Sequence, residues 1–159
     1  LSNHSYGVAA GWINIGGAPP DNWWWIGGES NDEDPNFGYY DSETQLWDQI
    51  AFDAPYYLIV KAAGNDRWDI GPEPGEEYTI IDQDGTPITT STAPRPADCA
   101  PEGYDCLATN SVAKNALTVG AVDDLPGGYS PLAGPLQVQM AGFSSWGPTD
   151  DGRIKPDLG

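Results

Sequence analysis

Apolar residues gather in a few short runs that are separated by long stretches rich in glycine, proline and polar residues. Residues 56–63 and 116–122 are nearly continuous apolar runs, which are typical of parallel strands covered on both faces of a sheet. Residues 1–8 are mixed and have a glycine at position 7, as expected of a strand that leads into a loop. Residues 138–145 predict a last extended segment. The pattern therefore predicts a mostly parallel sheet.

One helix is predicted between the first and second of these runs. Asp41 or Ser42 can serve as its N-cap, Gln45 completes a capping-box pattern, and Pro55 ends it. A helix followed by a buried strand indicates an α/β fold. The apolar residues that fall on one face of the predicted helix are Leu46, Trp47, Ile50, Ala51 and Ala54.

Two regions lie outside this α/β pattern. Residues 78–81 and 86–89 flank an Asp-Gln-Asp-Gly turn and predict a β-hairpin that projects from the main sheet, with Pro87 favouring a sheet edge. Residues 11–40 are rich in Gly, Pro, Asn and Trp and show no sustained period, so we expect a long, aromatic-packed surface insertion. We interpret residues 1–159 as one domain with insertions at 11–40 and 72–106.

Charge narrows the range of partners. The 159 residues include 6 basic and 24 acidic ones, which give a formal net charge of −18. Such a charge repels nucleic-acid phosphates and anionic membranes, and no apolar run is long enough to span a bilayer. Because the carboxylates are spread over many loops, they favour the solvated surface of a secreted or salt-adapted protein over a site for a cationic substrate.

Cys99 and Cys106 are the only cysteines. The turn-forming residues between them predict a small loop-closing disulfide, with two free thiols as the alternative. Their spacing matches no common zinc pattern.

Two acidic turns are weak candidates for binding Ca²⁺, although solvated turns are the favoured interpretation and neither matches a complete EF-hand loop. Their carboxylates belong to Asp32, Asp34, Asp82 and Asp84.

Four segments carry the most specific chemistry. Ala-Gly-Asn at residues 63–65 closes a buried strand, where the amide of Asn65 is held at the strand's carboxyl end. The others are Ser-x-Gly at 5–7, Val-Gly-Ala-Val-Asp at 119–123 and Phe-Ser-Ser-x-Gly at 143–147. In this order they resemble the middle of a subtilisin-like serine peptidase, a subtilase. Without the other three segments, residues 63–65 would be interpreted simply as a turn that contains an asparagine.

The resemblance implies a partial three-layer α/β fold with a mostly parallel sheet. It also implies that Asn65 donates a hydrogen bond to the oxyanion of a peptide substrate, an interaction worth roughly 3 to 4 kcal/mol when such a donor is deleted. No cofactor is required for this chemistry. The residues expected to bind the substrate backbone and form its pocket are Ser5, Tyr6, Gly7, Ala62, Ala63 and Gly64.

The same resemblance places the catalytic triad outside the chain. The family's Asp-Thr-Gly strand and His-Gly-Thr-His helix would precede Leu1, and its Gly-Thr-Ser-Met-Ala helix would follow Gly159. We therefore expect the isolated chain to be inactive. A complete peptidase acting on peptides or proteins would take the triad from flanking sequence or from a complementing chain.

His4 is the only histidine. Because neighbouring residues in a strand point to opposite faces, His4 and Ser5 are poorly placed to bond, and a core histidine is favoured over a general base.

Two other functions stay open at this stage. One is a carbohydrate- or peptide-binding module, and the less favoured one is a glycoside hydrolase with paired carboxylates. The tryptophans that such a module would use are Trp12, Trp23, Trp24, Trp25 and Trp68.

Overall fold

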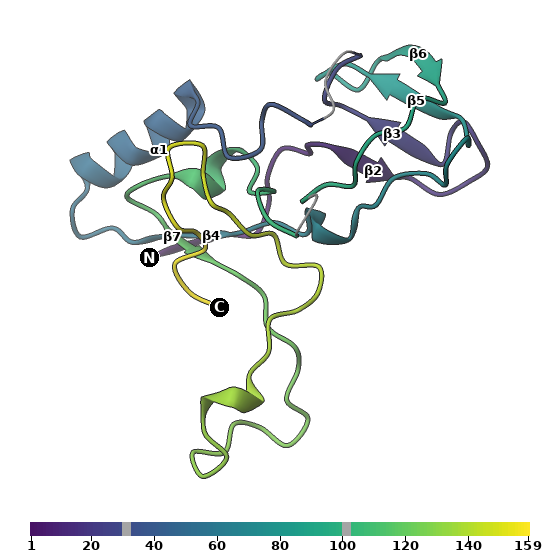
Figure 1. The fold of residues 1–159 in the computed structure, drawn as a ribbon. Helices are drawn as coiled ribbons and strands as arrows, with labels where there is room; N and C mark the ends of the chain where they lie inside the picture. Colours follow the sequence, from purple (N-terminus) through teal and green to yellow (C-terminus); the bar gives the residue numbers. More distant parts are fainter. Residues whose placement is uncertain (30–32, 100–102) are drawn as a thin grey trace.

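The computed structural model describes residues 1–29, 33–99 and 103–159. Its first sheet has three parallel strands in the order β1-β4-β7, of which β4 and β7 are labelled in Figure 1. Ser2 of β1 (Ser2–His4) pairs with Ile59 of β4 (Ile59–Ala62), and Val60 pairs with Leu117 of β7 (Leu117–Val119). The predicted α/β architecture is confirmed, although each strand is shorter than the segment that predicted it.

Helix α1 (Ser42–Asp53) begins and ends close to the predicted positions. The carboxylate of Asp41 accepts a hydrogen bond from the amide of Thr44 at 2.7 Å, so Asp41 is the N-cap. The predicted capping box is wrong, because the third helical residue after this cap is Thr44 rather than Gln45.

The predicted apolar face of α1 is also wrong in part. Leu46 and Ile50 are 62% and 54% exposed, while Trp47 and Ala51 pack against the buried Ile59 of β4. The face that turns inward is set by polar contacts, which periodicity of apolar residues does not register.

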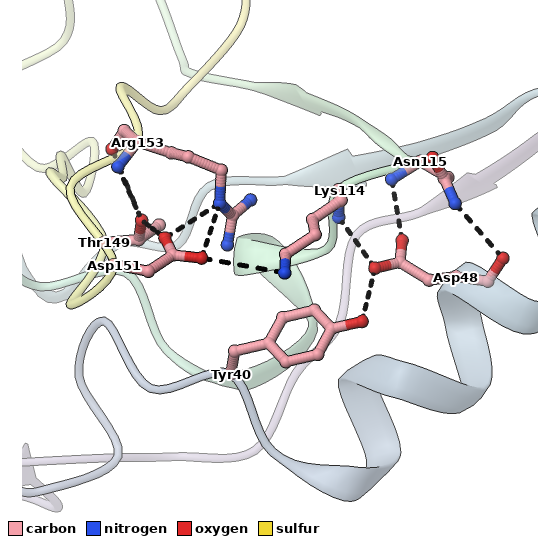
Figure 2. Close-up of polar contacts among 7 residues, drawn as sticks. All are labelled: Tyr40, Asp48, Lys114, Asn115, Thr149, Asp151 and Arg153. Carbon is pink, nitrogen blue, oxygen red and sulfur yellow. Dashed lines mark hydrogen bonds and ion pairs between the residues drawn. The ribbon is translucent and has the colours of Figure 1, made fainter.

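Asp48 provides those contacts (Figure 2). Its carboxylate accepts hydrogen bonds from the Tyr40 hydroxyl at 2.6 Å and from the amides of Lys114 and Asn115 at 3.1 and 2.7 Å. The bond to Asp48 and burial together raise the pKa of Tyr40 to about 12. The buried carboxylate thereby fixes α1 to the segment that enters β7.

A second set of polar contacts, around Lys114 and Asp151, lies beside the contacts of Asp48 in Figure 2. The ammonium of Lys114 lies 4.3 Å from the centre of the Tyr40 ring and 3.8 Å from the carboxylate of Asp151. Asp151 also accepts two hydrogen bonds from Arg153, at 2.8 and 3.0 Å. The turn near residue 150 is thus joined to the same corner of the fold.

The two faces of the three-stranded sheet differ. On one face, the His4 ring lies 4.8 Å from the Trp47 ring of α1, and Ile59 is buried. On the other face, Asn3, Val60 and Val119 line a hollow of about 450 Å³. The prediction that the strands are covered on both faces therefore fails for the part of the chain that the structure describes.

A second sheet corrects the prediction for residues 11–40. Strands β2 (Trp12–Asn14) and β3 (Trp23–Trp25) form an antiparallel pair, and β3 runs parallel to β5 (Tyr78–Ile81). β5 and β6 (Pro87–Ser91) form the predicted hairpin, with β6 at the edge. Strands of three residues are too short to show a period, which is why the sequence pattern indicated only an insertion.

Two tryptophans of this second sheet belong to its core. Trp12 and Trp25 are buried, their rings lie 5.0 Å apart, and Trp12 contacts the Tyr78 ring at 4.7 Å. Asp98 is buried beside them, and its carboxylate accepts a hydrogen bond from the amide of Trp12 at 2.9 Å. These aromatic side chains stabilise the fold and are not available as a binding surface.

The remaining chain is mostly turns. The short 3-10 helices are η1 (Asp66–Trp68), η2 (Thr109–Val112) and η3 (Pro135–Gln137). The predicted extended segment at 138–145 is reduced to a single bridge between Val122 and Met140. Within the described ranges, no helix has the length and apolarity needed to cross a membrane.

We predict that Asp48→Ala lowers the free energy of unfolding by about 2–4 kcal/mol, because it leaves buried donors without an acceptor. Urea denaturation measures the change. The matched control is Asp53→Ala at the exposed end of the same helix, where we expect a change within about 0.5 kcal/mol. Equal effects of the two substitutions would contradict the role of Asp48.

Candidate functional site

The carboxyl ends of β1 and β4 meet at one edge of the parallel sheet. Ser5 follows β1 and Ala63 follows β4, and the two segments line a hollow of about 240 Å³. The structure thus brings together every residue that the sequence predicted for the site. These residues are Ser5, Tyr6, Gly7, Ala62, Ala63, Gly64 and Asn65.

Asn65 lies where β4 passes into η1. It precedes the first residue of η1, with φ −128° and ψ 12°, and its side chain is exposed and makes no capping hydrogen bond to that turn. An exposed neutral amide at the end of a strand can donate to an oxygen of a bound ligand.

Gly64 gives the turn its shape. Its φ of +123° lies in the region that favours glycine, and a Cβ at this position would lie 2.7 Å from the Ser145 hydroxyl oxygen. A side chain at residue 64 would therefore displace the turn that carries Asn65.

Ser145 binds this turn on both sides of Asn65. Its amide donates to the carbonyl of Gly64 at 3.1 Å, and its hydroxyl donates to the Asp66 carboxylate at 2.9 Å while accepting from the Asp66 amide at 3.0 Å. Ser145 is fully buried. The sequence singled out residues 143–147 as a motif but gave no sign of this contact, because the two segments are far apart along the chain.

Asp66 of this turn interacts electrostatically with two further aspartates. Burial raises the pKa of Asp66, which the hydrogen bond from Ser145 partly offsets. Burial also raises the pKa of Asp69 to about 6 and that of Asp98 to about 9, with further contributions from neighbouring carboxylates. These groups hold protons more tightly than exposed aspartates do.

Lys61 is a site residue that the sequence reasoning missed. Its ammonium donates a hydrogen bond to the carbonyl of Tyr6, and burial lowers its pKa. The only signal in the sequence was a charged residue inside the apolar run at 56–63, which the strand prediction absorbed.

The weak calcium candidates do not converge in the structure. Asp82 accepts hydrogen bonds from the amides of Asp84 and Thr86 at 3.0 and 2.8 Å, and buried Asp34 accepts from the amide of Gly11 at 2.7 Å. Asp32 lies outside the described residues. Among the residues that are described, no group of three or more potential metal ligands is present.

The two cysteines and the histidine make structural contacts. Cys99 and Cys106 form a disulfide, with their Cα atoms 4.8 Å apart. The ring of His4 bonds the Ser2 hydroxyl at 2.9 Å and the Tyr6 hydroxyl at 2.6 Å, rather than Ser5. His4 thus has neighbours of the kind expected of a structural histidine.

The family model described as "Subtilase family" matches residues 1–159. The chain belongs to the subtilase family. A search of curated proteins finds no match to it.

For this subtilase we predict that Ser145→Ala loosens the turn that carries Asn65. The substitution removes both contacts of the hydroxyl, and we expect the free energy of unfolding to fall by about 1–3 kcal/mol because the partners stay partly buried. Amide hydrogen exchange at Asp66 should accelerate. The pKa of Asp66 should rise further, since the lost hydrogen bond favours the charged form.

Urea denaturation, hydrogen exchange and an NMR titration of the Asp66 carboxyl group measure these changes. Ser130→Ala in another loop is the matched control and should alter none of them. Unchanged amide exchange at Asp66 in folded Ser145→Ala would contradict the role of Ser145 in holding this turn.

Proposed function

We propose that the chain is the central part of a secreted subtilisin-like serine endopeptidase and supplies its oxyanion hole and substrate-binding strand edges. The observation that carries the proposal is the exposed amide of Asn65, on a turn whose backbone is held by Ser145 at the hollow where β1 and β4 end. Membership of the subtilase family supports it.

In this proposal, Asn65 acts when a serine attacks the carbonyl carbon of a peptide bond. The carbonyl oxygen then becomes an oxyanion, and the Asn65 amide donates a hydrogen bond to it. A donor fixed before the reaction stabilises the transition state without reorganising. The turn conformation imposed by Gly64 and the Ser145 contacts provides that fixed position.

The peptide itself would bind in an extended form. The segments Ser5–Gly7 and Ala62–Gly64 follow neighbouring parallel strands and lie on either side of the hollow. Backbone groups beyond the ends of the strands are suited to pairing with an extended substrate, as peptides do when they add to a sheet edge. The partner is therefore a peptide or a protein rather than a nucleic acid.

The serine, its histidine base and the orienting aspartate would come from flanking sequence or from a complementing chain. The hollow of about 450 Å³ on the uncovered face of the sheet borders Asn65 and offers room for such segments. The chain on its own should then be inactive. No cofactor takes part in this chemistry, and calcium would have only a structural role in the acidic loops.

Secretion is part of the proposal for two reasons. Disulfides persist in oxidising compartments, and the bond between Cys99 and Cys106 closes a loop beside buried residues. The net charge of −18 suits a protein that must stay soluble outside the cell.

We predict that Asn65→Ala lowers kcat by about 10²–10³-fold in a peptidase that carries this chain together with its triad segments. KM should change little, because the lost contact forms mainly in the transition state. Steady-state hydrolysis of a peptide substrate measures both constants.

Asn14→Ala is the control, since Asn14 is exposed on the second sheet. An unchanged kcat in correctly folded Asn65→Ala would contradict the proposed function. Labelling of the isolated chain by an active-site phosphonate would contradict the assignment of the triad to other segments.

A further inference from the structure

Lys61 lies at an unusual place for a lysine. It is in the middle strand of the parallel sheet and is only 4% exposed, yet its side chain lines the hollow beside Asn65. Lysine is almost never buried to this extent unless its charge is paired, because removing an ammonium from water is costly. The position therefore calls for a partner.

The described residues provide Lys61 with a hydrogen-bond acceptor but not with an ion-pair partner. The ion pairs of residues 1–29, 33–99 and 103–159 involve other basic side chains, and none includes Lys61. Its ammonium donates to the Tyr6 carbonyl and lies close to Gly7, where an added Cβ would be 3.6 Å away. An ammonium has three donors, so further acceptors can bind it.

Asp66 is the acidic residue that interacts electrostatically with Lys61, and it is a weak counter-ion. It lines the same hollow, but its carboxylate is held by Ser145 and does not form an ion pair with Lys61. Burial raises the pKa of Asp66, which disfavours its charged form. The positive charge of Lys61 is thus incompletely balanced.

Resting on the proposed function, we propose that this hollow receives the substrate side chain that precedes the cleaved bond. Lys61 makes the hollow select glutamate or aspartate at that position. The segments Ser5–Gly7 and Ala62–Gly64 form its walls, and Asn65 lies at its edge. The acidic side chain completes the pairing of Lys61 through a charge-assisted hydrogen bond.

The size of the hollow fits a single side chain. Its volume of about 240 Å³ is below the roughly 300–1,000 Å³ of pockets that hold small-molecule ligands. A neutral side chain of the same shape leaves the ammonium unpaired, and a basic one repels it. Specificity of this kind comes from the buried polar group that the wrong ligand fails to satisfy.

The test compares peptides that differ only at the residue before the cleaved bond, with Glu, Gln, Leu or Lys there. We expect kcat/KM for the Glu peptide to exceed that for the Gln peptide by about tenfold or more in the peptidase that carries this chain, equivalent to about 1.4 kcal/mol. In Lys61→Met this ratio should fall to about one. In the control Lys114→Met, which alters an exposed lysine of the Figure 2 network, the ratio should stay as it is.

A binding measurement separates the pocket from catalysis. Product peptides that end in Glu or Gln are titrated into the same protein by calorimetry, and the Glu product should bind more tightly only when Lys61 is present.

The Glu preference should also depend on pH. Burial lowers the pKa of Lys61, so its ammonium loses its proton earlier as the pH rises. The preference should therefore be lost on raising the pH, before the ordinary lysine value of about 10.4 is reached. It should also fade below about pH 4.3, where the glutamate becomes protonated. The ionisable groups that face Lys61 are Asp66, Tyr6 and His4, the last of which is its register partner on β1. Asp66→Asn should leave the preference for Glu over Gln in place.

Three results would overturn the inference alone. These are equal kcat/KM values for Glu and Gln peptides, a preference that survives Lys61→Met, and a uniform loss with all four peptides in Lys61→Met. The last would mean that Lys61 only supports the Tyr6 carbonyl. Failure of the proposed function is distinguishable, because it would appear as peptide hydrolysis that is insensitive to Asn65→Ala.

Discussion

The contact of Ser145 with the turn at residues 64–66 determines what the site can do. Its amide and hydroxyl bind Gly64 and Asp66, and Asn65 between them is left with an exposed side chain. An amide on a free loop would lose entropy each time it met a ligand, whereas a fixed amide does not. The buried serine thus fixes the backbone of the turn from which the Asn65 side chain extends, at a point where two parallel strands end.

The rest of the fold supports this edge from one side. Asp48 fixes α1 to the segment that enters β7 (Figure 2). Trp47 of α1 contacts His4 of β1 and packs against the cluster that contains Ile59 of β4. The tryptophan-centred second sheet has a core of its own and leaves the strand ends accessible. The opposite face of the parallel sheet is hollowed.

Much of this arrangement could be predicted from the sequence because it depends on local signals. The apolar run at 56–63, the turn at 82–85 and Pro55 have direct conformational consequences, so the central strand, the hairpin and the end of α1 followed from them. The site residues around Asn65 were predicted from a resemblance, because the motifs occur in the order found in subtilases.

What the sequence did not predict depends on contacts between distant segments. The inward face of α1 is set by a carboxylate that binds residues more than sixty positions away, and no helical period contains that information. Strands β2 and β3 are too short for a period of two, and their tryptophans looked like loop residues. Lys61 was taken as part of a strand because burial of a charge is visible only once the neighbouring Tyr6 is in place.

The central claim is that the Asn65 amide lies where an oxyanion forms. A crystal structure of the peptidase containing this chain, with a peptide boronic acid bound to its catalytic serine, tests it most directly. The account predicts an Asn65 Nδ2 atom about 2.7–3.1 Å from the boronate oxygen that stands in for the oxyanion. An Asn65 side chain turned away from that oxygen, with other donors bound to it, would contradict the account.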